Sequence, residues 1–102
     1  MYWFTFPPPD KRRPVVVVTR QSALGFLTNV SVAPVTSTVR PSPTYVSLGP
    51  ADGLPRESAI NLDGIQTIPI RELGPYITRL SPAKLREVRL AIEFAFGLRR
   101  LR

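Results

Sequence analysis

Two short stretches of the chain carry the residue types best suited to hold a phosphodiester. The first is the basic cluster Lys11, Arg12 and Arg13, which runs through a proline into four consecutive valines. The second is an apolar stretch that ends in the hydroxyl pair Thr36 and Ser37. Runs of β-branched residues are typical of strands, so both stretches predict polar groups fixed at the rim of a sheet. A guanidinium and hydroxyl groups held at one rim can together bind the oxygens of a phosphate.

The composition removes most other chemistries. The chain of 102 residues has no His and no Cys, which excludes a histidine acid–base pair, a thiolate nucleophile and a zinc–thiolate site. The net charge is +7, and 12 of the 14 basic residues are Arg, which favours a polyanionic partner, either nucleic acid or an acidic protein. No apolar run approaches the ~20 residues of a membrane span, and the first residues lack the basic region of a signal peptide. We therefore expect a cytoplasmic protein that does not enter a membrane.

The elements that position these residues are expected to be short, because 12 prolines are spread along the chain. Apolar and β-branched patterns predict strands over residues 2–6, 15–19, 29–35, 45–48, 58–62 and 66–70. Residues 22–26 are expected to form a short connection. Pro34 predicts that its strand is an edge strand or carries a bulge, and Asp63-Gly64 predicts a hairpin turn between the last two strands.

One helix is expected near the C-terminus. Ser81 is a favourable N-cap, Pro82 is a favourable first residue, and Gly97 is a plausible end. Between them, apolar residues recur at helical spacing at Leu85, Val88, Ile92 and Ala95. Residues 99–102 are expected to be a frayed basic tail. These elements predict a single domain over residues 1–102 that is mainly β with a C-terminal α-helix, built as a small barrel or a strongly bent antiparallel sheet.

Several stretches in order resemble the MazF/PemK (also called Kid) toxins of bacterial type II toxin–antitoxin pairs. They are residues 12–18, 32–37 and 54–68, followed by Leu80-Ser81-Pro82 and the helix. The resemblance implies an SH3-like barrel that usually forms a homodimer and cuts single-stranded RNA through the RNA's own 2′-hydroxyl, with no metal or cofactor. It also implies an antitoxin partner, a small protein whose acidic tail occupies the RNA groove.

The resemblance assigns the family's essential Arg to Arg13 and its essential Thr to Thr36, followed by Ser37. Asp63 matches the Asp of an Arg-x-Asp element, while Asn61 stands where the Arg of that element would be. By their chemistry, Arg13 is a bidentate phosphate clamp first and a general acid second, the hydroxyls donate to the phosphate, and Asp63 is the best base available. Candidate substrate-binding residues are Lys11, Arg12, Arg20, Arg40, Asn61 and Gln66.

Alternatives remain open from the sequence. Arg13 can be a solvated charge that protects a strand edge, Thr36-Ser37 can end a strand, and Asp63 can be a turn residue. A CcdB-like toxin would poison DNA gyrase through the end of the helix, around residues 96–99, and cut nothing. A catalytically weakened relative would bind RNA or an antitoxin only, and the short loop over residues 7–12 and Asn61 favour that alternative.

Overall fold

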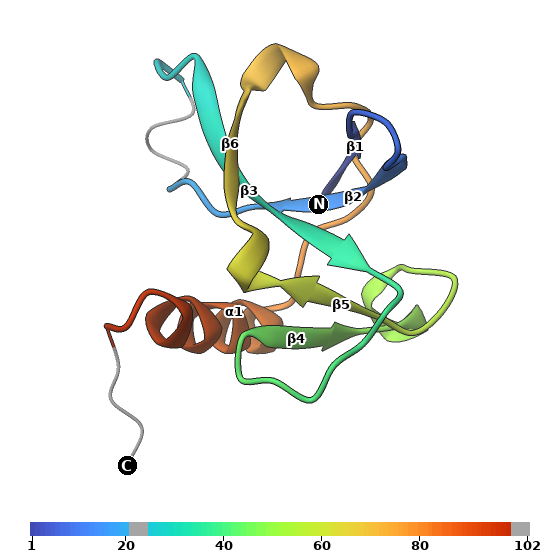
Figure 1. Cartoon of the computed structure of the whole chain (residues 1–102), viewed down its shortest axis with the longest axis vertical. Coiled ribbons are helices and arrows are strands. Elements are labelled where there is room, and N and C mark those ends of the chain that lie inside the picture. The colour runs from blue at the N-terminus through green and yellow to red at the C-terminus, as the bar shows by residue number, and fades with distance from the viewer. Residues whose placement is uncertain (21–24, 99–102) are drawn as a thin grey trace.

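In the computed structural model, which describes residues 1–20 and 25–98, six antiparallel strands form one bent sheet and one helix packs against it (Figure 1). The strands are β1 (Tyr2–Thr5), β2 (Arg12–Val17), β3 (Asn29–Thr36), β4 (Tyr45–Leu48), β5 (Ser58–Asn61) and β6 (Gln66–Pro69). The helix is α1 (Pro82–Ala95), and three 3₁₀ turns are η2 (Pro50–Asp52), η3 (Leu62–Gly64) and η4 (Ile70–Glu72). The expected tail 99–102 and most of the connection 22–26 lie outside the described residues.

β3 is the centre of the sheet. The strand order is β1-β2-β3-β5-β4, and β6 also pairs with β3. The start of β3 pairs with β6 and its end pairs with β5, so two parts of the sheet share this one strand (Figure 1). No described pairing joins β4 to β1, so the sheet is strongly bent but not closed. The mainly β fold with a C-terminal helix is confirmed, and of its two expected forms the bent sheet is the one observed.

Pro34 does not mark an edge strand or a bulge, and that prediction is wrong. β3 is central, and its register with β2 runs without interruption up to the pair Val15 and Pro34. On the other side, β3 pairs with β6 up to Val32 and with β5 from Val35. Pro34 therefore lies in the gap between the strands β6 and β5. No hydrogen bond between strands is needed from its backbone nitrogen there, so the N–H that proline lacks is not missed.

The predicted hairpin at Asp63-Gly64 is also wrong. β5 pairs with β3 and β4, and β6 pairs with β3, so the two strands never pair with each other. The turn η3 joins them instead and buries Leu62 completely. An added Cβ at Gly64 would lie 3.0 Å from Cγ of Pro34, so a larger residue there would require a small shift of the turn or of the proline. The turn thus carries the chain from one part of the sheet to the other.

Two hydrophobic cores lie on opposite faces of the sheet. One packs α1 against the sheet and includes Val16, Val35, Ile60, Leu62, Val88 and Ala91. The other lies on the opposite face and includes Phe4, Phe6, Val15, Val30, Val32 and Ile68. Successive side chains of a strand point to opposite faces, so the neighbouring valines of β2 supply both cores. This explains why the valine run is apolar without alternation, as a strand buried on both faces requires.

The helix begins as predicted. Ser81 is the N-cap, its hydroxyl accepts a hydrogen bond from the backbone N–H of Lys84 at 3.2 Å, and Pro82 is the first residue. Gly97 follows the C-cap with a positive φ of 70°. Of the predicted apolar face, Val88 is buried, whereas Leu85 is 51% exposed. Within the described residues, no helix has the length and apolar character needed to cross a membrane.

Candidate active site

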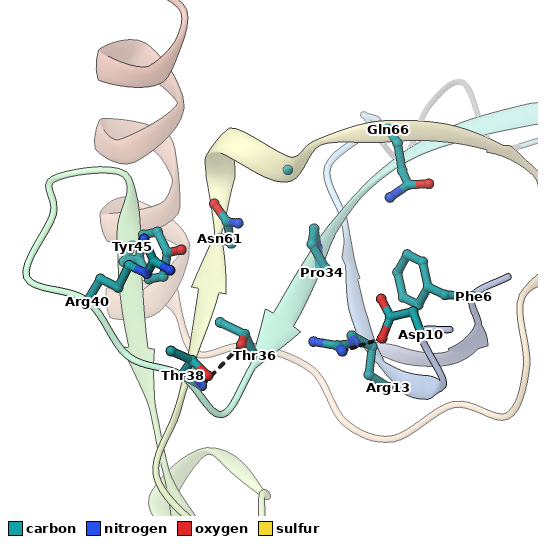
Figure 2. Close-up of a pocket in the computed structure, with 11 residues that line it drawn as sticks. Phe6, Asp10, Arg13, Pro34, Thr36, Thr38, Arg40, Tyr45, Asn61 and Gln66 are labelled. Carbon is teal, nitrogen blue, oxygen red and sulfur yellow. Dashed lines mark hydrogen bonds and ion pairs between the residues drawn. The ribbon is translucent and has the colours of Figure 1, made fainter. Parts of the chain in front are cut away.

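The register of the strands brings Arg13 and Thr36 to the same place. Val15 on β2 is paired with Pro34 on β3. Arg13 and Thr36 lie two residues beyond this last pair on their strands, so both side chains are on the face that carries Val15 and Pro34. Figure 2 shows the two side chains on neighbouring strands, with the guanidinium directed toward the end of β3. Residues far apart in the sequence therefore form a pair because of strand pairing alone.

The pair lies in a groove of about 420 Å³ on this face of the sheet (Figure 2). The groove crosses from the β1–β2 connection over the end of β3 to β5 and β4. Its lining residues are Phe6, Asp10, Arg13, Pro34, Thr36, Thr38, Arg40, Tyr45, Asn61, Gly64 and Gln66. Strand register accounts for several of them, since Gln66 is paired with Val32 and Tyr45 with Asn61. Of the predicted site residues, the structure thus brings together Arg13, Thr36, Arg40, Asn61 and Gln66.

Arg13 is held by groups on its own edge of the groove. Its Nη2 donates to Oδ1 of Asp10, and the guanidinium carbon lies 5.9 Å from the ring centroid of Phe6. The Arg13 side chain is only 26% exposed, and its Nε is buried with no hydrogen-bond partner within the described residues. A buried donor without a partner is costly in a folded protein and often marks a ligand position. The guanidinium is therefore fixed in place with donors left for an incoming anion.

Asp10 is one of the groove residues that the sequence interpretation missed. It is the only carboxylate among the described residues that line the groove. The backbone N–H of Lys11 and then the Arg13 guanidinium lower the pKa of this carboxyl, since both donate hydrogen bonds to its charged form. The signal was the spacing of an acidic residue three positions before the essential Arg, on a loop too short to carry it elsewhere.

The Thr36 hydroxyl is oriented by its own loop. Its Oγ1 accepts a hydrogen bond from the backbone N–H of Thr38 at 3.1 Å. Because one lone pair is used in this way, the hydroxyl hydrogen is free to donate into the groove. Thr38 itself lines the groove and was not foreseen. Ser37 is exposed beyond the end of β3 and does not line it.

Three basic residues at the ends of β2 were predicted to bind substrate but do not line the groove, namely Lys11, Arg12 and Arg20. Arg12 points to the other face, where its guanidinium lies 4.4 Å from the centroid of the Trp3 ring. Lys11 is exposed on the connection before β2, and only its backbone N–H takes part in the site, through Asp10. Arg20 is exposed beyond the opposite end of β2.

Asp63 also lies outside the groove lining. Its Oδ2 accepts a hydrogen bond from the hydroxyl of Thr44 at 2.6 Å, and its backbone N–H donates to Oδ1 of Asn61 at 3.0 Å. Thr44 is buried at 5% exposure, and its Oγ1 lies 2.8 Å from Oγ of Ser42. These contacts tie the turn η3 to the loop before β4, so the carboxylate that was expected to be the base makes structural contacts. Within the described residues, no group of three or more His, Cys, Asp or Glu could hold a metal ion.

The structure combines a small bent antiparallel sheet, one packed helix, and Arg13 and Thr36 in an open groove. Comparison with known proteins gives the family. The profile of the PemK-like, MazF-like toxin of type II toxin–antitoxin systems matches residues 1–96. The chain therefore belongs to this family. Of the two toxin families considered from the sequence, MazF/PemK and CcdB-like, it is the one that cuts RNA.

Individual relatives agree. The endoribonuclease MazF3 of Mycobacterium tuberculosis is 42% identical over 89 residues, which is 87% of this chain and 86% of that protein. The probable endoribonuclease MazF5 of the same species is 39% identical over 85 residues, 82% of this chain and 78% of that protein. The structure of the Mycobacterium tuberculosis toxin MazF-mt6 superposes with a TM-score of 0.88 at 37% identity, covering 97% of each chain. An endoribonuclease from a mycobacterial species, solved in complex with its cognate antitoxin, has a TM-score of 0.84 at 27% identity and covers 98% of this chain and 95% of its own.

Proposed function

We propose that this chain is the toxin of a type II toxin–antitoxin pair and acts as an endoribonuclease on single-stranded RNA. The observation that carries the proposal is the pairing of Arg13 and Thr36 in one groove, in a chain whose relatives are named endoribonucleases. In this mechanism the 2′-oxygen attacks the neighbouring phosphorus, the bond from phosphorus to the 5′-oxygen breaks, and no metal takes part. The products carry a 2′,3′-cyclic phosphate and a 5′-hydroxyl.

The described residues divide this work between charge and orientation. Arg13 clamps the phosphate as negative charge accumulates on its oxygens, and the Thr36 hydroxyl donates to the same group. Asp10 is a positioning residue, because its ion pair with Arg13 fixes the guanidinium. The hydrogen bonds from the backbone N–H of Lys11 and from Arg13 lower the pKa of its carboxyl, which makes it a weak base. Water in the open groove takes the 2′-hydroxyl proton and returns a proton to the 5′-oxygen. Arg40, Asn61 and Gln66 contact the RNA on either side of the scissile phosphate.

We further propose a homodimer in the cytoplasm with an acidic antitoxin as partner. The net charge of +7 favours an acidic ligand, and a relative of similar structure was solved with its cognate antitoxin. A chain that binds the antitoxin over the groove would be inhibited by it. The measurement is size-exclusion chromatography with light scattering, with and without the product of the neighbouring reading frame.

The test of the activity is cleavage of a long RNA in EDTA by the purified chain, followed by mapping of the cut ends. We expect cuts at defined positions, with 5′-hydroxyl ends, and a loss of about 100- to 1000-fold in rate for Arg13→Ala and for Thr36→Ala. Arg56→Ala is the matched control, because Arg56 is exposed and outside the groove lining. Full activity in both groove variants would overturn the site. Tight RNA binding without product would support the weakened relative instead.

A further inference from the structure

The end of the groove away from Asp10 is built differently from the end that holds Arg13. Tyr45 on β4 is paired with Asn61 on β5, and the register of β5 with β3 continues to set Asn61 beside Pro34. Both Tyr45 and Asn61 line the groove (Figure 2). The row of Pro34, Asn61 and Tyr45 lies two residues along β3 from Thr36, about 7 Å away. One nucleotide spans that distance between its phosphate and its base.

The amide of Asn61 is held in one orientation. Its Oδ1 accepts the backbone N–H of Asp63 at 3.0 Å, which assigns the oxygen to the turn η3. Its Nδ2 lies over Gly64, 3.3 Å from the position that a Cβ of that residue would take. Figure 2 shows the Asn61 nitrogen directed toward Pro34 and the oxygen turned away. Nδ2 makes no hydrogen bond within the described residues, so it is a donor available to the groove, while Oδ1 is turned away from Pro34 and bonded to the turn η3.

Tyr45 supplies an aromatic surface beside this donor. It is half-buried, and it lines both the groove and a second hollow between β4 and α1. An aromatic ring exposed to a groove can serve as a stacking platform for an unpaired base. Arg40 lines the same end of the groove and adds a second group that only donates.

We propose that Tyr45 and Asn61 form the pocket for one base next to the cut, and that this pocket selects a base with a carbonyl oxygen on the edge it presents. Uracil and guanine offer such an oxygen, whereas cytosine and adenine present an amino group at the equivalent position. The base stacks on Tyr45, and its carbonyl oxygen accepts a hydrogen bond from Nδ2 of Asn61. This inference rests on the proposed endoribonuclease function and names the feature of the RNA that the groove reads.

The test is the base preference of Asn61→Asp on a pool of short RNAs randomised around one cut site. The aspartate keeps an acceptor for the N–H of Asp63 but replaces the donor that faces the groove with a second acceptor. We expect the ratio of kcat/KM for uracil or guanine over cytosine or adenine to fall by about 5- to 50-fold at one position, with the other positions unchanged. Absolute rates also fall because of the added charge, so the ratio is the readout.

Two control variants separate hydrogen bonding from charge and from folding. Gln66→Glu makes the same amide-to-carboxylate change on the other side of the groove, and we expect no change of preference at the position read by Asn61. Asn29→Asp makes the same amide-to-carboxylate change at the exposed start of β3, far from the groove, and tests the effect on folding alone.

The stacking role of Tyr45 is tested by two variants. Tyr45→Phe should keep the base preference with near-normal KM, whereas Tyr45→Leu should raise KM by about 5- to 100-fold.

The outcomes are distinct. A changed ratio in Asn61→Asp that is absent from Gln66→Glu supports the inference. If the wild-type chain cuts RNA and Asn61→Asp keeps its preference at every position, the base pocket is overturned and the nuclease function stands. If the wild-type chain cuts no RNA, the proposed function is overturned, and the inference is overturned with it.

Discussion

Gly64 in the turn η3 lies against Pro34 of the central strand β3. A Cβ added at Gly64 would lie 3.0 Å from Cγ and 3.2 Å from Cδ of Pro34, and 3.3 Å from Nδ2 of Asn61. The proline ring is rigid, and its strand is paired with β2, so it cannot turn aside as a flexible side chain would. Gly64→Ala therefore forces the turn away from β3.

The expected cost follows from two opposing terms. Overpacking of a close contact costs about 1–3 kcal/mol, while replacing glycine with alanine restricts the unfolded chain and returns about 0.4–1 kcal/mol. The φ of Gly64 is not positive, so no further strain is added. The net loss of unfolding free energy is about 1.3 kcal/mol at the centre of these ranges, which lowers the Tm of a domain of this size by about 5–10 °C.

The assay is thermal unfolding followed by circular dichroism at one fixed protein concentration, with Gly25→Ala as the matched control. A Cβ at Gly25 meets no atom within 4 Å, and its φ is not positive, so that variant should be as stable as the wild type or slightly more stable. The reasoning is refuted if Gly64→Ala unfolds at the wild-type temperature, because the turn would then yield at no cost.

Three further changes test separate parts of the molecule. Asp10→Asn should lower the Tm only above about pH 4. The carboxyl has a lowered pKa in the folded protein, so it stabilises the fold at pH values above its ordinary pKa of 3.8, and this effect is lost as the pH falls through the folded-state pKa. Measuring the Tm of both proteins from pH 3 to 7 checks this. The same variant should reduce kcat more than it changes KM, because Arg13 loses its orientation. Thr44→Val removes the donor to Asp63 at constant shape and should cost about 1–2 kcal/mol in urea unfolding, and an unchanged midpoint would contradict it. Ser81→Ala removes the helix cap and should cost about 1 kcal/mol, with cleavage per folded molecule unchanged in the RNA assay.

The elements of this fold were predictable because local patterns specify them. The valine run, the alternation before Pro34 and the cap at Ser81-Pro82 indicate strand and helix without reference to the rest of the chain. Strand partners were not predictable in the same way. Asp63-Gly64 has the local chemistry of a hairpin, yet tertiary packing of Leu62 and the contact of Gly64 with Pro34 send the next strand to β3.

The groove contains part of the candidate site that the sequence predicts. Arg13 and Thr36 came from the family resemblance, and both line the groove. Asp63 also came from the resemblance and Arg12 from its charge, but Asp63 is hydrogen-bonded to Thr44 and Arg12 lies over Trp3, so neither lines the groove. Asp10 was overlooked because the three-residue spacing that places it beside Arg13 was not used, although the two residues form a local ion pair.

The division of β3 between two partners also bears on how the protein is made. The groove needs Arg13 from one part of the sheet, Asn61 from the other, and a central strand that holds them together. The core beneath β5 is completed only by Val88 and Ala91 of the C-terminal helix. Domains fold as units during synthesis, and pairing between distant segments forms late. A nascent chain on the ribosome therefore lacks this support for the groove until α1 has emerged and packed on the sheet.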